Sequence, residues 1–308
     1  MNEGYKCGYV ALIGRPNAGK STLLNNILGS KLAITSAKPQ TTRNRIAGIH
    51  TDDQMQVILV DTPGIHEAWS ELNKVMVDAA MSALDEVDLV LWVGDMTVLA
   101  KRVEAEQDIL DGLERSIAER MAGKRVLFVA NKMDVVPKPL VLPVIAAVQE
   151  ATNLLAAVPI SALSGDGVPT LLDVIRSHLP EHPPMFPEDE WAQVTERFLV
   201  SEVIREKLFH LTEQEIPYSC FVEIERFDES ERHTEGMTRI YAKILVERPS
   251  QKGIVIGKRG EMLRRIGTAA RKELQELLDS RVYLELFVKV EKDWTRTKRG
   301  LRRVGFEA

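Results

Sequence analysis

Short apolar runs alternate with longer amphipathic stretches through the first 180 residues of the chain. The runs that are typical of buried strands are Gly8–Ile13, Val57–Val60, Leu89–Val93, Val126–Ala130 and Ala157–Ile160. Strands of this kind, separated by helical stretches, form βα units that wind a parallel sheet covered on both faces. The pattern therefore predicts an α/β fold with a mostly parallel sheet.

The pattern changes beyond residue 190. A helical stretch is followed by two alternating runs, Tyr218–Glu225 and Arg239–Val246. Next come the segment Gly253–Gly260 and a helix whose apolar residues share one face. A last strand is expected at Val282–Val290, where every second residue is apolar. The predicted order is α-β-β-α-α-β, which is an α+β domain.

Between the two patterns lies Leu179–Glu190, which holds four prolines and four acidic residues. This composition is typical of a linker rather than of a helix or strand. Two domains are also the default expectation for a chain of 308 residues. We therefore predict a first domain at residues 1–178, a linker at residues 179–190 and a second domain at residues 191–308.

Composition excludes several classes of protein and adds one clue about partners. No apolar run approaches the roughly 20 residues of a membrane-spanning helix, and the N-terminus lacks the pattern of a signal peptide. Cys7 and Cys220 are too few for a disulfide framework, so we expect buried free thiols. Residues 251–308 hold 15 Lys and Arg against 8 Asp and Glu, within a chain of net charge −5. This basic block indicates a polyanionic partner, nucleic acid or membrane, unless it is only a solvated charged face.

The segment Gly14–Ser21 (GRPNAGKS) matches the phosphate-loop pattern, directly after one predicted strand and before a helix. Glycines let consecutive backbone amides turn onto phosphates, and the helix N-terminus adds its dipole. Lys20 would supply a charge to the β- and γ-phosphate oxygens, and the Ser21 hydroxyl would bind Mg²⁺.

A second motif, Asp61–Gly64 (DTPG), ends the predicted strand Val57–Val60. The Asp61 carboxylate would hold the Mg²⁺ shell, and the Gly64 amide would sense the γ-phosphate. Between the two motifs, Thr42 is the best candidate to bind Mg²⁺ only in the triphosphate state, with Thr41 as the alternative.

A third motif, Asn131–Asp134 (NKMD), follows the predicted strand Val126–Ala130. Asp134 can accept hydrogen bonds from guanine N1–H and N2–H₂, which adenine does not offer. Asn131 would tie the loops together, Lys132 would lie against the base, and the amides of Ser161 and Ala162 would face guanine O6. The three motifs together predict a GTP site.

Hydrolysis is expected to be slow. Ile65 stands after Gly64, where Ras-like proteins carry a Gln that orients the attacking water, and even Ras hydrolyses GTP unaided at only ~10⁻⁴ s⁻¹. Arg43 is a candidate arginine finger, although a solvated loop arginine is the more ordinary interpretation.

The predicted second domain holds Gly257–Gly260 (GKRG), a GxxG loop of the kind that clamps a nucleic-acid backbone. Its glycines allow close approach of phosphates, which Lys258 and Arg259 would neutralise. A plain helix–helix turn is the alternative, but the α-β-β-α-α-β order and the local basic charge favour RNA binding. Trp294 and Phe306 in the tail could stack on bases, although packing onto the domain is the more ordinary role for each.

These motifs resemble those of the bacterial Era GTPases along essentially the whole chain: GRPNAGKS, PQTTR, DTPGI, NKMD, ISA and VIGKRGEMLRRIG. The resemblance implies a P-loop GTPase domain followed by a type-II KH domain. It also implies an assembly factor of the small (30S) ribosomal subunit that binds 16S rRNA near its 3′ end. A cytoplasmic location with peripheral contact to the inner membrane, and K⁺ held through Asn17, are further implications. We also expect a monomer.

The predicted site residues fall into four groups. Those expected to contact GTP or GDP are Gly14, Arg15, Pro16, Asn17, Ala18, Gly19, Lys20, Ser21, Asp61, Thr62, Pro63, Gly64, Asn131, Lys132, Met133, Asp134, Ser161 and Ala162. Lys20, Thr42 and Gly64 are expected to act in catalysis. Ser21, Thr42 and Asp61 are the expected Mg²⁺ ligands. Gly257, Lys258, Arg259 and Gly260 are the expected RNA-binding residues.

Two alternatives to a GTP-controlled RNA-binding switch stay open. One is a regulatory GTPase directed to a membrane or a protein through its basic tail. The other is a structural RNA-binding protein with an inactive nucleotide site, which the intact Lys20, Ser21, Thr42 and Asp61 argue against.

Overall fold

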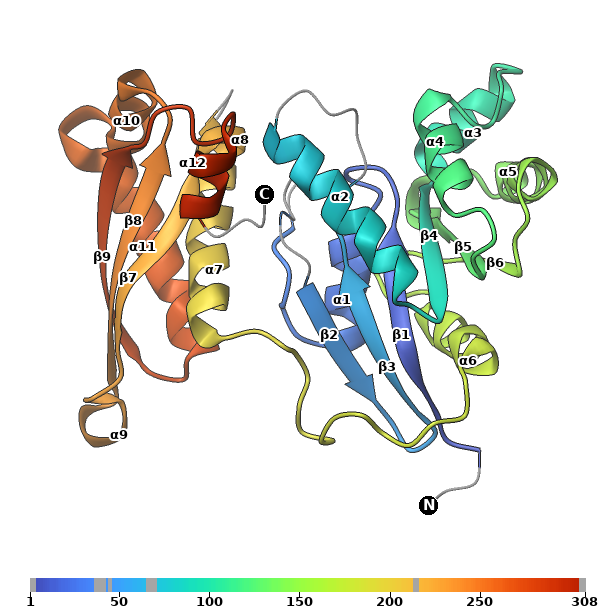
Figure 1. Cartoon of the computed structure of the whole chain (residues 1–308), viewed down its shortest axis with the longest axis horizontal. Coiled ribbons are helices and arrows are strands. Elements are labelled where there is room, and N and C mark those ends of the chain that lie inside the picture. Colours follow the sequence, from blue (N-terminus) through green and yellow to red (C-terminus); the bar gives the residue numbers. More distant parts are fainter. Residues whose placement is uncertain (1–3, 36–42, 44–45, 65–70, 213–215, 305–308) are drawn as a thin grey trace. The chain divides into compact units, whose positions relative to one another are not determined.

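The computed structural model describes residues 4–35, 43, 46–64, 71–212 and 216–304 (Figure 1). These residues fall into two compact units. The first unit holds the described residues up to Gly64 together with Met76–Gln193, and the second holds residues 71–75 together with the described residues from Val194 onward.

The first unit is built on a sheet whose described strands lie in the order β2-β3-β1-β4-β5-β6. Neighbouring strands pair in parallel, except that β2 runs antiparallel to β3. The strands are β1 (Lys6–Ile13), β2 (Ile46–Thr51), β3 (Met55–Asp61), β4 (Leu89–Asp95), β5 (Val126–Asn131) and β6 (Ala156–Pro159). The mostly parallel sheet predicted from the sequence is confirmed, and β2 is the strand that the apolar pattern missed.

Helices cover both faces of this sheet, as its apolar strands require. They are α1 (Lys20–Leu28), α2 (Glu71–Asp85), α3 (Met96–Glu104), α4 (Gly112–Arg120), the 3₁₀ turn η1 (Met133–Val135), α5 (Lys138–Ala151) and α6 (Val168–His178). On one face, apolar residues of α2, α3, α4 and α5 form a common core with β1, β4 and β5. At its centre, Trp92 and Phe128 meet edge to face with ring centroids 5.2 Å apart. In Figure 1, α1 lies on the other side of the sheet.

The proline-rich segment after α6 contains isolated bridges and turns, and it is bound along the first unit. The side chain of Gln56 in β3 is fully buried and accepts hydrogen bonds from the amides of Met185 and Phe186 at 2.7 and 2.9 Å. Farther along, the Ile49 amide donates to the Trp191 carbonyl, and Ala192 forms an antiparallel bridge with Gly48 of β2. The segment is therefore not a free tether on this side.

The second unit has a sheet in the order β7-β8-β9, with β7 and β8 antiparallel and β8 and β9 parallel. A parallel pair needs a long crossover, and here it contains two helices. The elements are α7 (Glu196–Leu211), α8 (Ile216–Ser219), β7 (Phe221–Asp228), α9 (Arg232–Glu235), β8 (Met237–Val246), α10 (Pro249–Ile256), η2 (Lys258–Gly260), α11 (Glu261–Leu277), β9 (Arg281–Val290) and α12 (Lys298–Arg303). The predicted α-β-β-α-α-β order is confirmed, with short turns added.

The core of the second unit follows the predicted periodicities. Val200, Ile204 and Leu208 of α7 share one apolar core with alternate residues of β8 and with Ala270 and Leu274 of α11. One boundary differs from the prediction. The expected strand start at Tyr218 lies inside the helical turn α8, and β7 begins at Phe221. Pro217, with its fixed φ, suits the first turn of a helix.

Candidate nucleotide site and nucleic-acid groove

The predicted phosphate loop joins β1 to α1, and close contacts explain its glycines. A Cβ atom on Gly14 would lie 2.4 Å from the carbonyl oxygen of Val93 in β4. At Gly19, where φ is 99°, a Cβ atom would lie 2.2 Å from Nδ2 of Asn131. Asn17 adopts a φ of 63°, in the left-handed region that Asn tolerates better than most residues. Such turns are what allow backbone amides to line an anion-binding concavity.

Lys20 begins α1 and is held by the loop that precedes it. Its Nζ donates to the carbonyl oxygens of Gly14 and Arg15 at 3.1 and 2.9 Å. Burial lowers the pKa of Lys20 to about 8, although the nearby Asp61 carboxylate favours the charged form. A bound phosphate would favour that form further, because it adds negative charge beside Nζ.

Ser21 and Asp61 bring two oxygen ligands together. The Ser21 hydroxyl donates to Oδ2 of Asp61 at 2.7 Å, and Asp61 is fully buried at the carboxyl end of β3. Hydroxyl and carboxylate oxygens are the ligands that Mg²⁺ prefers, and Mg²⁺ commonly uses only one or two of them beside phosphate oxygens. The pair therefore fits the predicted metal.

The DTPG segment lies against the phosphate loop. A Cβ atom on Gly64 would lie 2.9 Å from the Cα atom of Pro16, so only glycine fits this approach. The Thr62 hydroxyl donates to the carbonyl of Leu12 at 2.7 Å and is buried, which makes it a structural contact between β3 and β1.

Three of the predictions near the γ-phosphate, those for Thr41, Thr42 and Ile65, lie outside the described residues. Arg43 is described, and its side chain is only 3% exposed. The expectation of a solvated loop arginine is therefore wrong, because this side chain is packed inside the protein.

Asn131 joins two of the predicted loops. Its Nδ2 donates to the Ala18 carbonyl at 2.7 Å, and its Oδ1 accepts the amide of Ala162 at 2.9 Å. The side chain is 2% exposed, so both bonds are shielded from water. The predicted role of Asn131 in tying the loops together is confirmed.

The rest of the predicted base-reading motif follows in η1. Lys132 adopts a left-handed φ of 70°, and its Nζ lies 2.6 Å from Oδ2 of Asp95. The amide of Met133 donates to the carbonyl of Ile160, which brings this turn beside the buried Ser161. Asp134 is exposed and therefore open to a ligand.

In the second unit, the GxxG loop separates α10 from α11. Gly257 has φ 72°, and a Cβ atom there would lie 2.7 Å from Cβ of Met262. Lys258 and Arg259 are both exposed, and Arg259 is itself left-handed with φ 53°. The loop therefore presents two cations at the N-terminus of the 17-residue helix α11, where the helix dipole also favours an anion.

A groove of about 360 Å³ begins at this loop and runs between α11 and β9. Gly267 lies in its wall, and a Cβ atom there would be in contact with Leu286 at 3.5 Å. The lining residues are Gly260, Leu263, Arg264, Gly267, Thr268, Arg271, Leu284, Glu285 and Leu286. Only Gly260 was among the predicted RNA-binding residues. The mid-helix glycine at position 267 and the arginines at 264 and 271 were the available signal for the others.

Two further expectations concern buried groups. Trp294 is fully buried and donates from Nε1 to the Ser219 carbonyl at 3.1 Å, so packing onto the domain is its confirmed role. Phe306 lies outside the described residues. Cys7 and Cys220 are buried free thiols, as predicted.

Two family models match the chain in the predicted order. Residues 9–132 match the 50S ribosome-binding GTPase family, and residues 215–295 match the KH domain family. A GTPase Era from Geotalea uraniireducens is 51% identical over 303 residues, which cover 98% of both proteins. The chain belongs to the Era family of GTPases.

Solved structures of Era agree with this assignment over the whole length. A crystal structure of Era in complex with MgGDPNP and nucleotides 1506–1542 of 16S ribosomal RNA has a TM-score of 0.91 at 38% identity, covering 99% of this chain and all of that one. Aquifex aeolicus Era bound to GDP and AlF₄⁻, a point variant, gives 0.88 at 39% identity, covering 98% and 100% of the two chains. The predicted pairing of a P-loop GTPase domain with a KH domain is therefore confirmed.

Among the described residues, the helices are all too short or too polar to cross a membrane.

Proposed function

We propose that this Era-family chain is a GTP-driven switch that binds 16S rRNA near its 3′ end during assembly of the small ribosomal subunit. The observation that carries the nucleotide half is the Asn131 side chain, because it joins the phosphate loop to the loop of residues 161–162. These contacts support a single site for the phosphate loop and the base-reading turn, and the Ser21–Asp61 hydrogen bond supports adding the DTPG segment to it. The RNA half is carried by the groove beside Gly257–Gly260.

In this proposal the loop of residues 14–21 binds the phosphates with its amides, and Lys20 neutralises the β- and γ-oxygens. Ser21, Asp61 and Thr42 hold Mg²⁺, which neutralises charge that develops on the phosphates. The amide of Gly64 senses whether the γ-phosphate is present. Asn131, Lys132, Met133 and Asp134, with Ser161 and Ala162, read the guanine base.

Hydrolysis by the chain alone is proposed to be slow, because Ile65 has no polar atom with which to orient water. We also propose that Asn17 helps to hold a K⁺ ion. Asn17 is exposed within the phosphate loop, where it adopts a left-handed φ of 63°. Replacing K⁺ by Na⁺ should therefore lower the rate of GTP hydrolysis, and equal rates in both salts would refute the K⁺ site.

The RNA target follows from the Era complex that contains nucleotides 1506–1542 of 16S ribosomal RNA. The groove supports it, since exposed Lys258 and Arg259 stand at one end and Arg264 and Arg271 line the wall. Apolar Leu284 and Leu286 form the opposite wall. Unpaired bases can pack on such a surface while the cations meet the backbone.

The nucleotide bound to the first unit is proposed to control RNA binding by the second unit through the proline-rich segment. That segment is hydrogen-bonded to β2 and β3, and β2 begins directly after the region that holds Thr41 and Thr42. In the GTP state Thr42 would bind Mg²⁺ and shift β2, and hydrolysis would release the RNA.

The deciding experiment measures affinity for an RNA of the 16S 3′ end with GTP analogue, with GDP and without nucleotide. We expect the GTP state to bind more tightly than the other two. Converting Lys258 and Arg259 to Glu should abolish RNA binding and leave GTP affinity intact. Equal RNA affinity in all three nucleotide states would contradict the switch, whereas loss of GTP binding in the double variant would mean that it had unfolded.

A cytoplasmic monomer with peripheral contact to the inner membrane is the remaining part of the proposal. Its support is the exposed basic tail, in which Lys292, Arg296, Lys298 and Arg299 lie on the surface. Flotation with anionic vesicles, with and without the RNA as competitor, tests this contact. Strong vesicle binding without RNA affinity would favour the membrane-directed alternative.

A further inference from the structure

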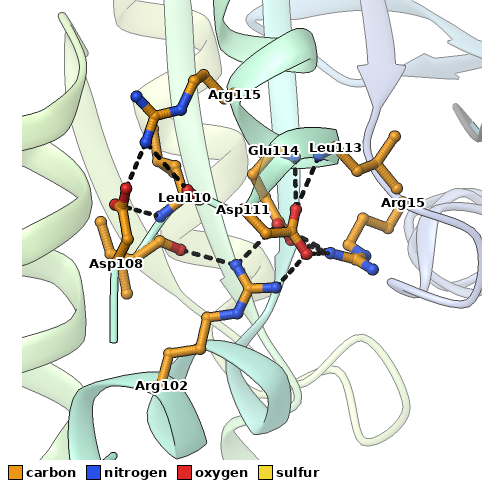
Figure 2. A network of polar contacts seen from close by, with 9 residues as sticks. Arg15, Arg102, Asp108, Leu110, Asp111, Leu113, Glu114 and Arg115 are labelled. Atoms are coloured by element: carbon orange, nitrogen blue, oxygen red, sulfur yellow. Dashed lines mark hydrogen bonds and ion pairs between the residues drawn. The ribbon is translucent and has the colours of Figure 1, made fainter. Parts of the chain in front are cut away.

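Arg15 lies inside the phosphate loop, yet its side chain is bound elsewhere. Its Nη1 lies 2.7 Å from Oδ2 of Asp111 and 2.8 Å from Oε2 of Glu114, both at the start of α4 (Figure 2). Its carbonyl oxygen, in contrast, accepts a hydrogen bond from Nζ of Lys20 at 2.9 Å. One residue thus links the catalytic lysine to α4.

The two carboxylates are shared with a second arginine. Arg102 of α3 pairs with Asp111 and lies 3.0 Å from Oε2 of Glu114, so the acids stand between two guanidinium groups, as Figure 2 shows. Arg102 also donates to the Ile109 carbonyl at 3.1 Å. Glu114 is only 4% exposed, and a buried carboxylate requires such compensation.

Asp111 has a second task in the same network. Its Oδ1 accepts the amides of Leu113 and Glu114 and so caps the N-terminus of α4. Burial would raise the pKa of Asp111, but its hydrogen bonds with Glu114, Arg15 and Arg102 hold that pKa well below the usual range. The carboxylate is therefore ionised whenever the protein is folded at neutral pH.

The segment of residues 95–114, which holds α3 and the start of α4, also contacts the base-reading motif. Asp95 caps α3 by accepting the Thr97 amide at 3.0 Å, and its other oxygen pairs with Lys132 at 2.6 Å. Residues 95–114 therefore bind the phosphate loop at one end, through Arg15, and the base-reading turn at the other end, through Lys132.

We propose that Arg15 is a positioning residue for the phosphate loop, held by Asp111 and Glu114 so that the loop is preorganised for nucleotide. The loop holds the non-glycine residue Asn17 at a left-handed φ of 63°, a conformation that needs support from its surroundings when the phosphates are absent. The anchor supplies this support from outside the site. Preorganisation raises affinity because the free loop does not have to be ordered when the nucleotide binds, and among variants of one site such differences appear mostly in the dissociation rate.

This inference rests on the proposed nucleotide site, and Arg15→Gln tests it. Arg102 still compensates Glu114 in that variant, so the fold is retained. Stopped-flow measurements with a fluorescent GDP and a fluorescent GTP analogue should show dissociation about tenfold faster for both, equal to about 1.4 kcal/mol. Single-turnover hydrolysis of bound GTP should change less than about threefold, because the bound phosphates then hold the loop.

Three variants separate positioning from general damage. Arg115→Gln is the matched control, since Arg115 pairs with the exposed Asp108 and not with the loop, and it should leave dissociation unchanged. Arg15→Lys should recover only part of the effect, because Lys lacks the planar fork. Asp111→Asn keeps the helix cap but removes the charge, and combining it with Arg15→Gln should add little to the single change.

The outcomes are distinct. The positioning role would be overturned if the nucleotide dissociated from Arg15→Gln at a rate within about twofold of that of the natural protein. An equal effect in Arg115→Gln, or full additivity with Asp111→Asn, would overturn it as well. If the natural protein bound no guanine nucleotide, the proposed function itself would fail, and this inference with it.

Discussion

At the scale of single residues, Lys20 needs its positive charge to bind phosphates, but it is buried where the charged form is disfavoured. Burial lowers its pKa from 10.5 to about 8 in the absence of ligand. The unfolded chain therefore binds more protons than the folded one between these two values. The free energy of unfolding of the nucleotide-free protein should accordingly receive a contribution that rises with pH across this window.

The same shift predicts proton uptake on binding. Bound phosphates restore the charged form, so GDP binding near pH ~9 should take up a proton, and affinity should fall as pH rises above about 8. Calorimetry in two buffers of different ionisation enthalpy measures the uptake. The variant Lys20→Met should show weaker binding and no such uptake, and identical uptake in both proteins would contradict the assignment.

Asp134 carries the predicted choice of base. Its carboxylate is exposed, beside a turn that Met133 fixes to Ile160. Changing Asp134→Asn replaces an acceptor by a donor opposite guanine N1–H, so GTP affinity should fall, by up to ~10⁴-fold if both hydrogen bonds are lost. Xanthine nucleotides should bind the variant better than guanine nucleotides do. Fluorescent-nucleotide titration tests both, and unchanged GTP affinity would exclude this role for Asp134.

Single residues also mark the limit of what the sequence predicts. Residues that belong to sequence motifs, such as Lys20 and Asn131, could be predicted because the spacing within a motif encodes a local geometry. Asp111 and Glu114 were not, because their contact with Arg15 spans about one hundred positions and depends on how α3 and α4 pack. The burial of Arg43 was missed for the same reason.

At the scale of elements, apolar runs and alternation predicted the described strands of both units except β2. The pattern missed β2, whose residues are partly exposed. Besides β3, this strand forms backbone hydrogen bonds with Trp191 and Gln193, which follow the proline-rich segment. The pattern also extended a strand into α8, since an apolar run of a few residues fits either structure. Edge strands and short turns depend on tertiary contacts that local pattern does not contain.

In helix α11, one glycine lowers the stability of the helix and leaves room in the groove for a ligand. Gly267 sits within the helix and faces the groove, where glycine costs up to ~1 kcal/mol relative to alanine. We predict that Gly267→Ala stabilises the second unit, because its Cβ fits at 3.5 Å from Leu286. The added methyl group also occupies the groove, so RNA affinity should fall.

The control for this prediction is Gly253→Ala in α10. A Cβ atom at Gly253 meets open space, so it should give a similar helix-propensity gain without touching the groove. Urea denaturation and RNA titration compare the two. If Gly267→Ala bound RNA as tightly as Gly253→Ala, the groove wall would not be the binding surface.

At the scale of the whole molecule, the sequence predicted two domains and a linker, and the structure adds how that linker is held on the first unit. Gln56 is the main anchor. Besides the amides of Met185 and Phe186, it binds the Phe186 carbonyl and the Thr51 hydroxyl through Nε2. Phe186 also packs beside Cys7, Ile49 and Ile58. A buried glutamine with this number of partners holds the segment at one register along β3.

This anchor predicts a variant that separates communication from binding. In Gln56→Leu, the amides of Met185 and Phe186 lose their acceptor, which costs about 1–3 kcal/mol for each amide that stays buried. The segment should therefore detach from β3. Nucleotide affinity, and the RNA affinity of the nucleotide-free protein, should stay close to normal, since neither site contains Gln56. The ratio of RNA affinities with GTP analogue and GDP should move towards one. The matched control is Lys6→Gln, which removes only the exposed pair with Glu181 and should leave that ratio unchanged. A lower free energy of unfolding in Gln56→Leu would confirm that the anchor is lost. If the ratio of RNA affinities were nevertheless normal, the signal between the units would take another route.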